Sequence, residues 1–157
     1  MTAQHVRRVV TLHPGDVALG LRGDRLETLL GSCVAIVLTD PRRTVGTMCH
    51  IVTSRPATTM RTASGAQADV ALQTMERLLQ SRGFVAARCE AYVFGGGNMF
   101  PGLVSGPSVG DANVQWAERA LAELGTRVLS VDVGGHVYRR LRWTVGPQAP
   151  QVEAVPL

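Results

Sequence analysis

A cysteine and a histidine occupy positions where the chain can bring a thiol and an imidazole onto one face of a β-hairpin. Residues Cys33–Thr39 and Thr44–Val52 are largely apolar runs, and Asp40-Pro41-Arg42-Arg43 lies between them. Asp at the first position and Pro at the second favour a type I turn. If the hairpin closes symmetrically on that turn, Cys33 faces His50, and directly opposed Cβ atoms lie about 4.5–5.5 Å apart.

This pair can supply a nucleophile and a base. A neighbouring imidazole lowers the pKa of a thiol and accepts its proton. Gly31 and Ser32 precede Cys33, and glycine permits a close backbone approach there, so that nearby amides can stabilise an oxyanion. The alternative is a cysteine that only packs in the core. The register decides between them, because a slip of one residue would put the two side chains on opposite faces.

A third group is expected to orient the imidazole. Glu27 and Thr28 are the candidates, since both lie on the predicted strand that enters Gly31. Adjacent strand residues point to opposite faces, so at most one of them reaches the pocket. A solvent-facing Glu27 beside a Thr28 that only packs in the sheet is an equally good interpretation. Cys49 and Cys89 are interpreted as packing thiols.

Composition narrows the class of protein. The 157 residues, of which 45% are hydrophobic and 18% charged, predict one globular domain. All sixteen basic residues are Arg, scattered along the chain, and aromatics make up only 4%, which disfavours a nucleic-acid-binding surface. No apolar run approaches the roughly twenty residues that cross a membrane. Three cysteines without a CxxC pair indicate free thiols in a reducing compartment, and we expect a cytoplasmic protein with no signal peptide.

The pattern along the chain predicts mostly strands, with two helices. Helices are expected from Ala68 to Gly83 and from Ala112 to Leu124, the second capped by Asp111 and ended by Gly125. Residues 55–64 are expected to form an exposed loop. We expect a single domain over residues 1–146 and a flexible tail over 147–157. The other strands are expected at residues 6–12, 16–21, 25–30, 88–94, 127–133 and 138–145.

Three consecutive glycines, Gly95-Gly96-Gly97, precede Asn98 at the end of a predicted strand. The Lys-Ser/Thr of a phosphate-binding loop is missing, and no helix follows at once because Pro101-Gly102 intervenes. We interpret the loop as one that lets a substrate backbone approach the thiol, so Gly96, Gly97 and Asn98 join Gly31 and Ser32 as candidate substrate-binding residues. A purely structural turn is the alternative.

Together these motifs resemble the CheD family of chemoreceptor glutamine deamidases. Gly31-Ser32-Cys33-Val34-Ala35, with His50 seventeen positions after the cysteine, is similar to the family's catalytic segment. Four later segments also resemble family motifs: Ala68-Asp69-Val70-Ala71, Gly95 to Phe100, Val109-Gly110 through Asn113, and Asp132 with Gly134-Gly135 and Arg139.

The resemblance implies an α/β (α+β) sandwich of mainly antiparallel sheet packed with two main helices. It further implies a cysteine amidohydrolase in which Cys33 is the nucleophile and His50 the base, with no metal or cofactor. The implied substrate is a glutamine on the cytoplasmic helices of chemoreceptors, and a CheC-type phosphatase is an implied partner. The alternative is a regulatory binding protein with little turnover.

The chain departs from the family at three positions. The family commonly has Thr six residues before the cysteine, where this chain has Glu27, with Thr28 one place later. The ungapped spacing predicts Glu27 as the third catalytic residue, with Thr28 as its rival. Ala112 replaces a helix-start Arg, and Gln67 stands where a Tyr precedes Ala-Asp.

Overall fold

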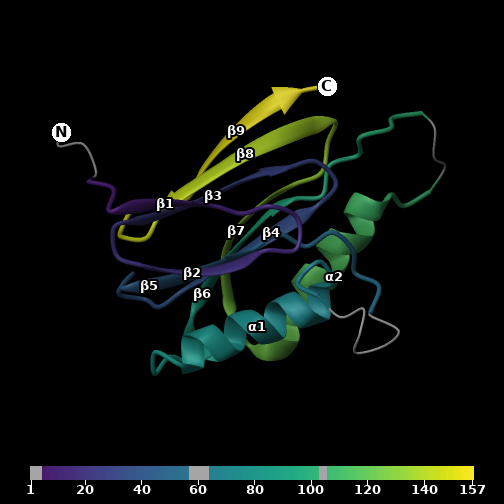
Figure 1. Ribbon diagram of the computed structural model, residues 1–157. Helices are drawn as coiled ribbons and strands as arrows, with labels where there is room; N and C mark the ends of the chain where they lie inside the picture. Colours follow the sequence, from purple (N-terminus) through teal and green to yellow (C-terminus); the bar gives the residue numbers. More distant parts are fainter. Residues whose placement is uncertain (1–4, 57–63, 103–105) are drawn as a thin grey trace.

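Two stacked β-sheets and a layer of helices make up the computed structural model, which describes residues 5–56, 64–102 and 106–157 (Figure 1). The four-stranded sheet, which lies on the side away from the helices, is here called the outer sheet. Its strand order is β1 (Arg8–Thr11), β3 (Asp24–Leu30), β8 (Val137–Thr144) and β9 (Gln151–Pro156). The sheet between it and the helices, the central sheet, has the order β2 (Val17–Leu21), β5 (Val45–Cys49), β4 (Val34–Thr39), β6 (Glu90–Gly95) and β7 (Arg127–Val133). Among the strands of the described residues, β1–β3 and β6–β7 are the parallel pairs and all the others are antiparallel, so the predicted α+β sandwich of mainly antiparallel sheet is confirmed.

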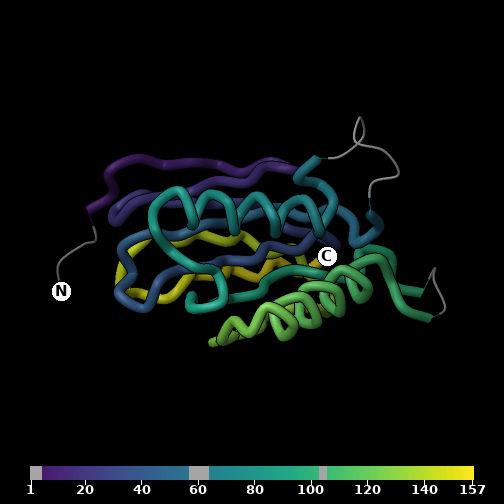
Figure 2. Tube along the Cα trace, turned by 90° about the horizontal axis from the view of Figure 1, so that it is seen from below, coloured from purple at the N-terminus to yellow at the C-terminus, as the bar shows by residue number. Residues whose placement is uncertain are grey.

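Two α-helices, α1 (Ala68–Gln80) and α2 (Val109–Leu124), lie side by side on the free face of the central sheet (Figure 2). A short 3₁₀-helix, η1 (Ala86–Arg88), leads into β6. Helix α1 buries residues at helical spacing, namely Ala68, Ala71, Leu72, Met75 and Leu79.

Helix α2 begins earlier than the sequence predicted. Ser108 is its N-cap and exchanges hydrogen bonds with Asp111 in a capping box, so Asp111 is the third helical residue and not the cap. Gly125 ends the helix in the left-handed conformation, as predicted, with φ 80°.

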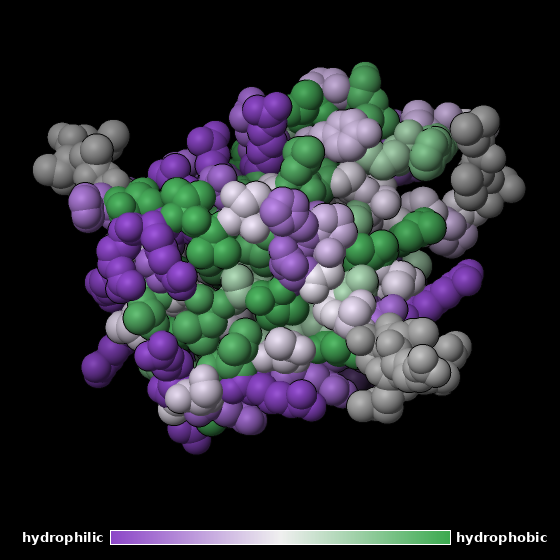
Figure 3. All heavy atoms as spheres, in the orientation of Figure 1, coloured by the Kyte–Doolittle hydropathy of each residue, from purple (hydrophilic) through white to green (hydrophobic). Residues whose placement is uncertain are grey.

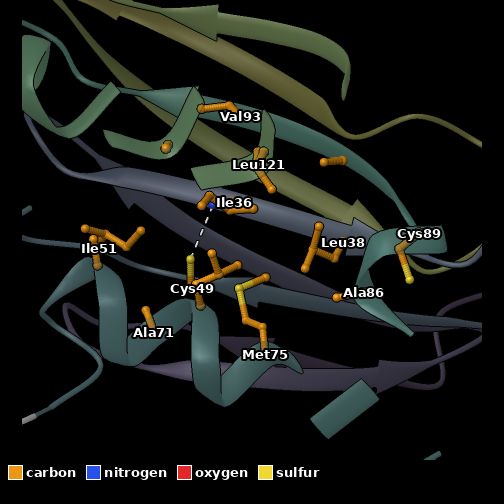
Figure 4. Packing of buried hydrophobic residues seen from close by; sticks show 14 of the residues in the cluster. Ile36, Leu38, Cys49, Ile51, Ala71, Met75, Ala86, Cys89, Val93 and Leu121 are labelled. Carbon is orange, nitrogen blue, oxygen red and sulfur yellow. Dashed lines mark hydrogen bonds between the residues drawn. The ribbon is translucent and has the colours of Figure 1, made fainter. Parts of the chain in front are cut away.

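Strand alternation divides the core into two layers. Ala35, Val37 and Met48 face the outer sheet, while Val34, Ile36 and Leu38 face the helices. Cys49 belongs to the helix-side layer, where its Sγ accepts a hydrogen bond from the amide of Ile36 at 3.4 Å (Figure 4). Cys49 and Cys89 are both buried, in agreement with their interpretation as packing thiols.

The flank of the sandwich carries apolar and hydrophilic side chains intermixed over its surface (Figure 3). Within the described ranges, no helix is both long and apolar enough to cross a membrane. The predicted exposed loop over residues 55–64 falls largely on residues 57–63, which lie outside the described part of the chain.

The C-terminal segment is a strand, and the predicted flexible tail is wrong for residues 151–156. Strand β9 pairs antiparallel with β8 from Val137↔Pro156 to Arg142↔Gln151. The prolines that suggested disorder lie at Pro147 and Pro150, before the strand, and at Pro156, its last residue. Those are positions that an edge strand tolerates, because its outer side needs no partner.

Candidate active site

The β4–β5 hairpin places Cys33 and His50 on the same face of the central sheet, although not directly opposite each other. The observed pairs, such as Leu38↔Thr47 and Thr39↔Gly46, are displaced by two residues from the symmetric register. A displacement of two keeps every side chain on its predicted face. In this register His50 falls opposite Ala35, one of the residues that face the outer sheet, and Cys33 is its diagonal neighbour.

Asp40 explains the displacement. The turn Asp40–Arg43 forms as predicted, with the Arg43 amide donating to the Asp40 carbonyl at 2.9 Å. The Asp40 carboxylate then accepts the amides of Thr44 and Val45 at 2.7 and 2.9 Å. Thr44 and Val45 are thereby kept out of pairing with β4, so the β4–β5 ladder begins at Thr39↔Gly46 and not at a Thr39–Thr44 pair.

The imidazole of His50 is held by Thr28. Oγ1 of Thr28 lies 2.7 Å from Nδ1 of His50 and 2.8 Å from the carbonyl oxygen of Leu12. A hydroxyl has one proton, and the carbonyl can only accept, so Thr28 donates to Leu12 and accepts from the Nδ1–H of His50. The proton of the neutral ring is thus fixed on Nδ1, which leaves Nε2 with the free lone pair of a base.

The structure brings Thr28, the rival candidate, into contact with His50, and not Glu27. Glu27 lies on the opposite face of β3, where its carboxylate accepts a hydrogen bond from Oγ1 of Thr11 at 3.4 Å. Thr28 points inward because the buried Leu26 and Leu30 flank it at two-residue spacing. The ungapped count back from Cys33 was misleading because strand alternation, and not distance from the cysteine, decides which side chain points inward.

Burial favours the uncharged forms of both His50 and Cys33. Burial lowers the pKa of His50, the Asp16 carboxylate raises it and His13 lowers it, and the net shift is downward. Burial also raises the pKa of the Cys33 thiol. Among the described residues, no hydrogen bond joins Cys33 to His50, so the lowered thiol pKa that the sequence suggested is not found in this conformation.

The three-glycine loop holds the segment that carries the cysteine. The amide of Gly96 donates to the carbonyl of Cys33 at 2.8 Å, and the amide of Gly97 donates to the carbonyl of Gly31 at 3.0 Å. A Cβ on Gly95 would lie 2.2 Å from the Cys33 carbonyl oxygen. The amides of Gly96 and Gly97, expected to approach a substrate, are therefore occupied by the backbone around Cys33.

Asn98 and the Gly31–Ser32 pair have different surroundings. Oδ1 of Asn98 accepts the amide of Phe100 at 3.0 Å, so its side chain shapes the loop beyond the glycines. Gly31 lies against Met99 and Tyr138, because a Cβ added to it would be 3.0 Å from the sulfur of Met99 and 3.4 Å from the Tyr138 ring. The role of Gly31 and Ser32 in substrate binding stays a prediction.

Two buried residues of the site were visible in the sequence only as parts of family motifs. The guanidinium of Arg139 donates to the carbonyls of Gly95 and Gly134 at 3.3 and 2.8 Å, and to Asp132 at 3.2 Å. Asn113, on α2, donates to backbone carbonyls on both sides of the site. Apart from the family motif, the signal that could have found Asn113 is a polar residue four positions before Ala117, on the apolar face of the helix.

Comparison with known proteins identifies the family. The family model described as CheD chemotactic sensory transduction matches residues 53–151. The chain is 37% identical to the probable chemoreceptor glutamine deamidase CheD 2 of Albidiferax ferrireducens, over 87% of this chain and 81% of the relative. It is 38% identical to the probable chemoreceptor glutamine deamidase CheD of Pseudomonas fluorescens, over 84% and 76% of the two chains. The corresponding protein of Methanococcus vannielii is 33% identical, over 81% and 82%.

These matches cover the candidate site as well as the fold. The family model begins after His50, but an alignment that includes 87% of this chain necessarily spans Thr28, Cys33 and His50. The chain belongs to the CheD family.

Proposed function

We propose that this protein is a cysteine-dependent deamidase that converts glutamine side chains of chemoreceptors to glutamate. The observation that carries the proposal is the Thr28–His50 hydrogen bond, which presents Nε2 as a base on the face that also carries Cys33. The names of the relatives supply the substrate class, since they are probable chemoreceptor glutamine deamidases.

The reaction follows from these groups. Nε2 of His50 takes the proton of the Cys33 thiol, and the thiolate attacks the carboxamide carbon of the substrate. The resulting imidazolium protonates the amide nitrogen as the C–N bond breaks, which releases ammonia and leaves a thioester on Cys33. His50 then removes a proton from water, the hydroxide attacks the thioester, and glutamate leaves as the thiol is restored. Thr28 accepts from Nδ1–H throughout, so the ring keeps its orientation.

The backbone around Cys33 supplies an oxyanion site in this scheme. The amides of Ser32 and Cys33 donate to no acceptor among the described residues. Free amides next to a nucleophile stabilise the negative oxygen of a tetrahedral intermediate. The carbonyls of Gly31 and Cys33 are fixed by the glycine loop, so these amides have a defined orientation before substrate binds.

The test is mass spectrometry of a chemoreceptor cytoplasmic fragment incubated with the protein. We expect the mass change from amide to acid at specific glutamines, together with ammonia release, and we expect both to be lost in Cys33→Ser. Cys49→Ser is the matched control, since that thiol is buried on the other side of the central sheet. Deamidation that survives Cys33→Ser would refute the cysteine mechanism, and receptor binding without any mass change would instead indicate a regulatory binding protein.

The partners and location follow from the same proposal. The proposed substrate is the cytoplasmic part of a receptor, so a cytoplasmic location is part of the proposal. A CheC-type phosphatase is the proposed regulatory partner, and co-purification of the two proteins from a mixture of purified components tests it.

A further inference from the structure

A buried amide on α2 joins the segment that carries Cys33 to the segment that carries His50. Nδ2 of Asn113 donates to the carbonyl of Ser32 at 3.2 Å and to the carbonyl of Val52 at 3.1 Å. The side chain is 1% exposed. Ser32 immediately precedes the cysteine, and Val52 follows the histidine by two residues.

These two carbonyls lie where β4 and β5 separate. The last backbone pair toward the site is Val34↔Ile51, in which each amide donates to the other residue's carbonyl. Beyond it, the Val52 amide turns away and donates to Ala66. The ladder ends there, and the two protons of the Asn113 amide connect the carbonyl of Ser32 on one strand end to the carbonyl of Val52 on the other, which fixes the spacing of the two ends.

Helix α2 holds Asn113 firmly at this place. Its first turn lies directly against the three-glycine loop, since a Cβ on Gly110 would be 2.4 Å from the carbonyl oxygen of Gly96. The same loop donates to the carbonyls of Gly31 and Cys33. The helix start, the glycine loop and the cysteine segment thus form one packed unit.

The other side-chain atom of Asn113 argues against a role in stability alone. Oδ1 is buried and has no hydrogen-bond partner in the described structure. A buried acceptor without a partner costs free energy. The reason for an amide at this position is therefore the pair of hydrogen bonds that its Nδ2 donates.

We propose that Asn113 is a positioning residue that sets the distance between the Cys33 thiol and the His50 imidazole. The proposal deepens the proposed deamidase function and rests on it. Asn113 is buried behind the backbone of both segments and does not touch the substrate. Its loss therefore lowers kcat and leaves KM unchanged, and it slows proton transfer from Cys33 to His50.

Asn113→Asp is the decisive variant, because it keeps the shape and replaces the donating nitrogen by an oxygen. The carboxyl can donate to one of the two carbonyls when protonated and to neither when ionised. We expect kcat to fall about 10- to 100-fold, as small displacements of catalytic groups do, with KM within twofold. The ratio of variant to wild-type kcat should rise as the pH is lowered. Asn113→Ser retains one neutral donor, so its kcat should lie between those of the wild type and Asn113→Asp. It replaces the aspartate variant if that variant does not fold.

The matched control is Thr126→Val. Thr126 is also buried, follows the other end of α2, and donates from Oγ1 to the carbonyl of Ala86 at 3.0 Å. Its loss should lower the unfolding temperature and leave kcat within twofold. If the Asn113 variants lose activity only as far as Thr126→Val does, the role of Asn113 is structural and the proposal is overturned.

A second readout does not depend on deamidation. The rate at which iodoacetamide alkylates Cys33, followed against pH, should change in shape in the Asn113 variants and stay as in the wild type in Thr126→Val. An unchanged profile in the Asn113 variants would overturn the positioning role, even with full folding. A wild-type protein that deamidates no receptor fragment would refute the proposed function and leave this alkylation test of Asn113 intact.

Discussion

Thr28 fixes the tautomer of His50 across the space between the two sheets. Its hydroxyl lies on β3 of the outer sheet, 2.7 Å from Nδ1 of a ring that belongs to the central sheet. That hydroxyl donates its single hydrogen bond to the Leu12 carbonyl. It can therefore only accept a hydrogen bond from Nδ1–H of His50. A neutral acceptor can orient the imidazole without a carboxylate, and it leaves the ring uncharged at rest.

Replacing Thr28 by Val should lower kcat, because Nδ1–H loses its acceptor and the ring can rotate or change tautomer. We expect a loss of about 10- to 100-fold, part of the 10²–10⁴-fold that a positioned base contributes. Thr28→Ser keeps the hydroxyl and should retain most of the activity. Glu27→Gln changes the other face of β3 and should stay within twofold of the wild type. The measurement is the rate of receptor-fragment deamidation by variants shown to be folded. A large loss in Glu27→Gln with little loss in Thr28→Val would instead assign the orientation of His50 to Glu27.

The sequence was sufficient for the faces of the strands but not for the register of the hairpin. Both strands are buried on both faces, so the position of the Asp-Pro turn, and not hydrophobic alternation, indicated the parity that brings Cys33 and His50 onto one face. The register depends on the Asp40 carboxylate, which accepts from the amides of Thr44 and Val45 and lengthens the loop. A side chain that captures backbone amides leaves no trace in hydrophobic periodicity.

Long-range contacts were likewise beyond the reach of local patterns. Leu26 and Leu30 on either side of Thr28 were sufficient to predict that it points inward, but the count from the cysteine outweighed them. The tail was misjudged for a different reason: its prolines suggested disorder, although β9 pairs with β8, the strand immediately before it in the chain. The hydrogen bonds of Asn113 connect residues more than sixty positions apart.

Cys33 should be the most reactive of the three thiols. It is partly exposed, whereas burial raises the pKa of Cys49 to about 12 and, with the nearby Asp40 and Glu90 carboxylates, that of Cys89 to about 11. At neutral pH, iodoacetamide should therefore label Cys33 first in the folded protein. Peptide mapping of the alkylated chain gives the order.

The pH dependence of that labelling tests whether the resting pair is neutral. Because burial raises the pKa of Cys33, its labelling rate should continue to increase with pH above the range where a free thiol levels off. A rate that levels off below neutral pH would mean that Cys33 and His50 form an ion pair at rest, which contradicts the neutral pair described here.

His50 should make the fold less stable in mild acid. Its pKa is lowered in the folded state, chiefly by burial, so the unfolded chain takes up the proton first. The free energy of unfolding should therefore be constant with respect to this group above about pH 6.5 and should fall as the pH drops below that value. His50→Asn lacks this group, so its unfolding free energy, measured by urea titration between pH 7 and 5, should fall less steeply. Equal slopes for the two proteins would show that His50 does not titrate between the folded and unfolded states.

Substitution of Gly95, compared with substitution of Gly125, distinguishes the cost of backbone strain from displacement of the cysteine segment. Its φ is +107°, a conformation that a side chain rarely adopts, and a Cβ there would lie 2.2 Å from the carbonyl oxygen of Cys33. Gly125 has φ +80° with no atom within 4 Å of an added Cβ, so Gly125→Ala carries a comparable backbone cost, about 1–2 kcal/mol, without a collision. We expect Gly95→Ala to move the cysteine segment and lower kcat by about 10²-fold, while Gly125→Ala loses stability alone. Both are measured by thermal unfolding and receptor deamidation, and a Gly95→Ala protein with wild-type kcat would show that the cysteine segment is not held by the glycine loop.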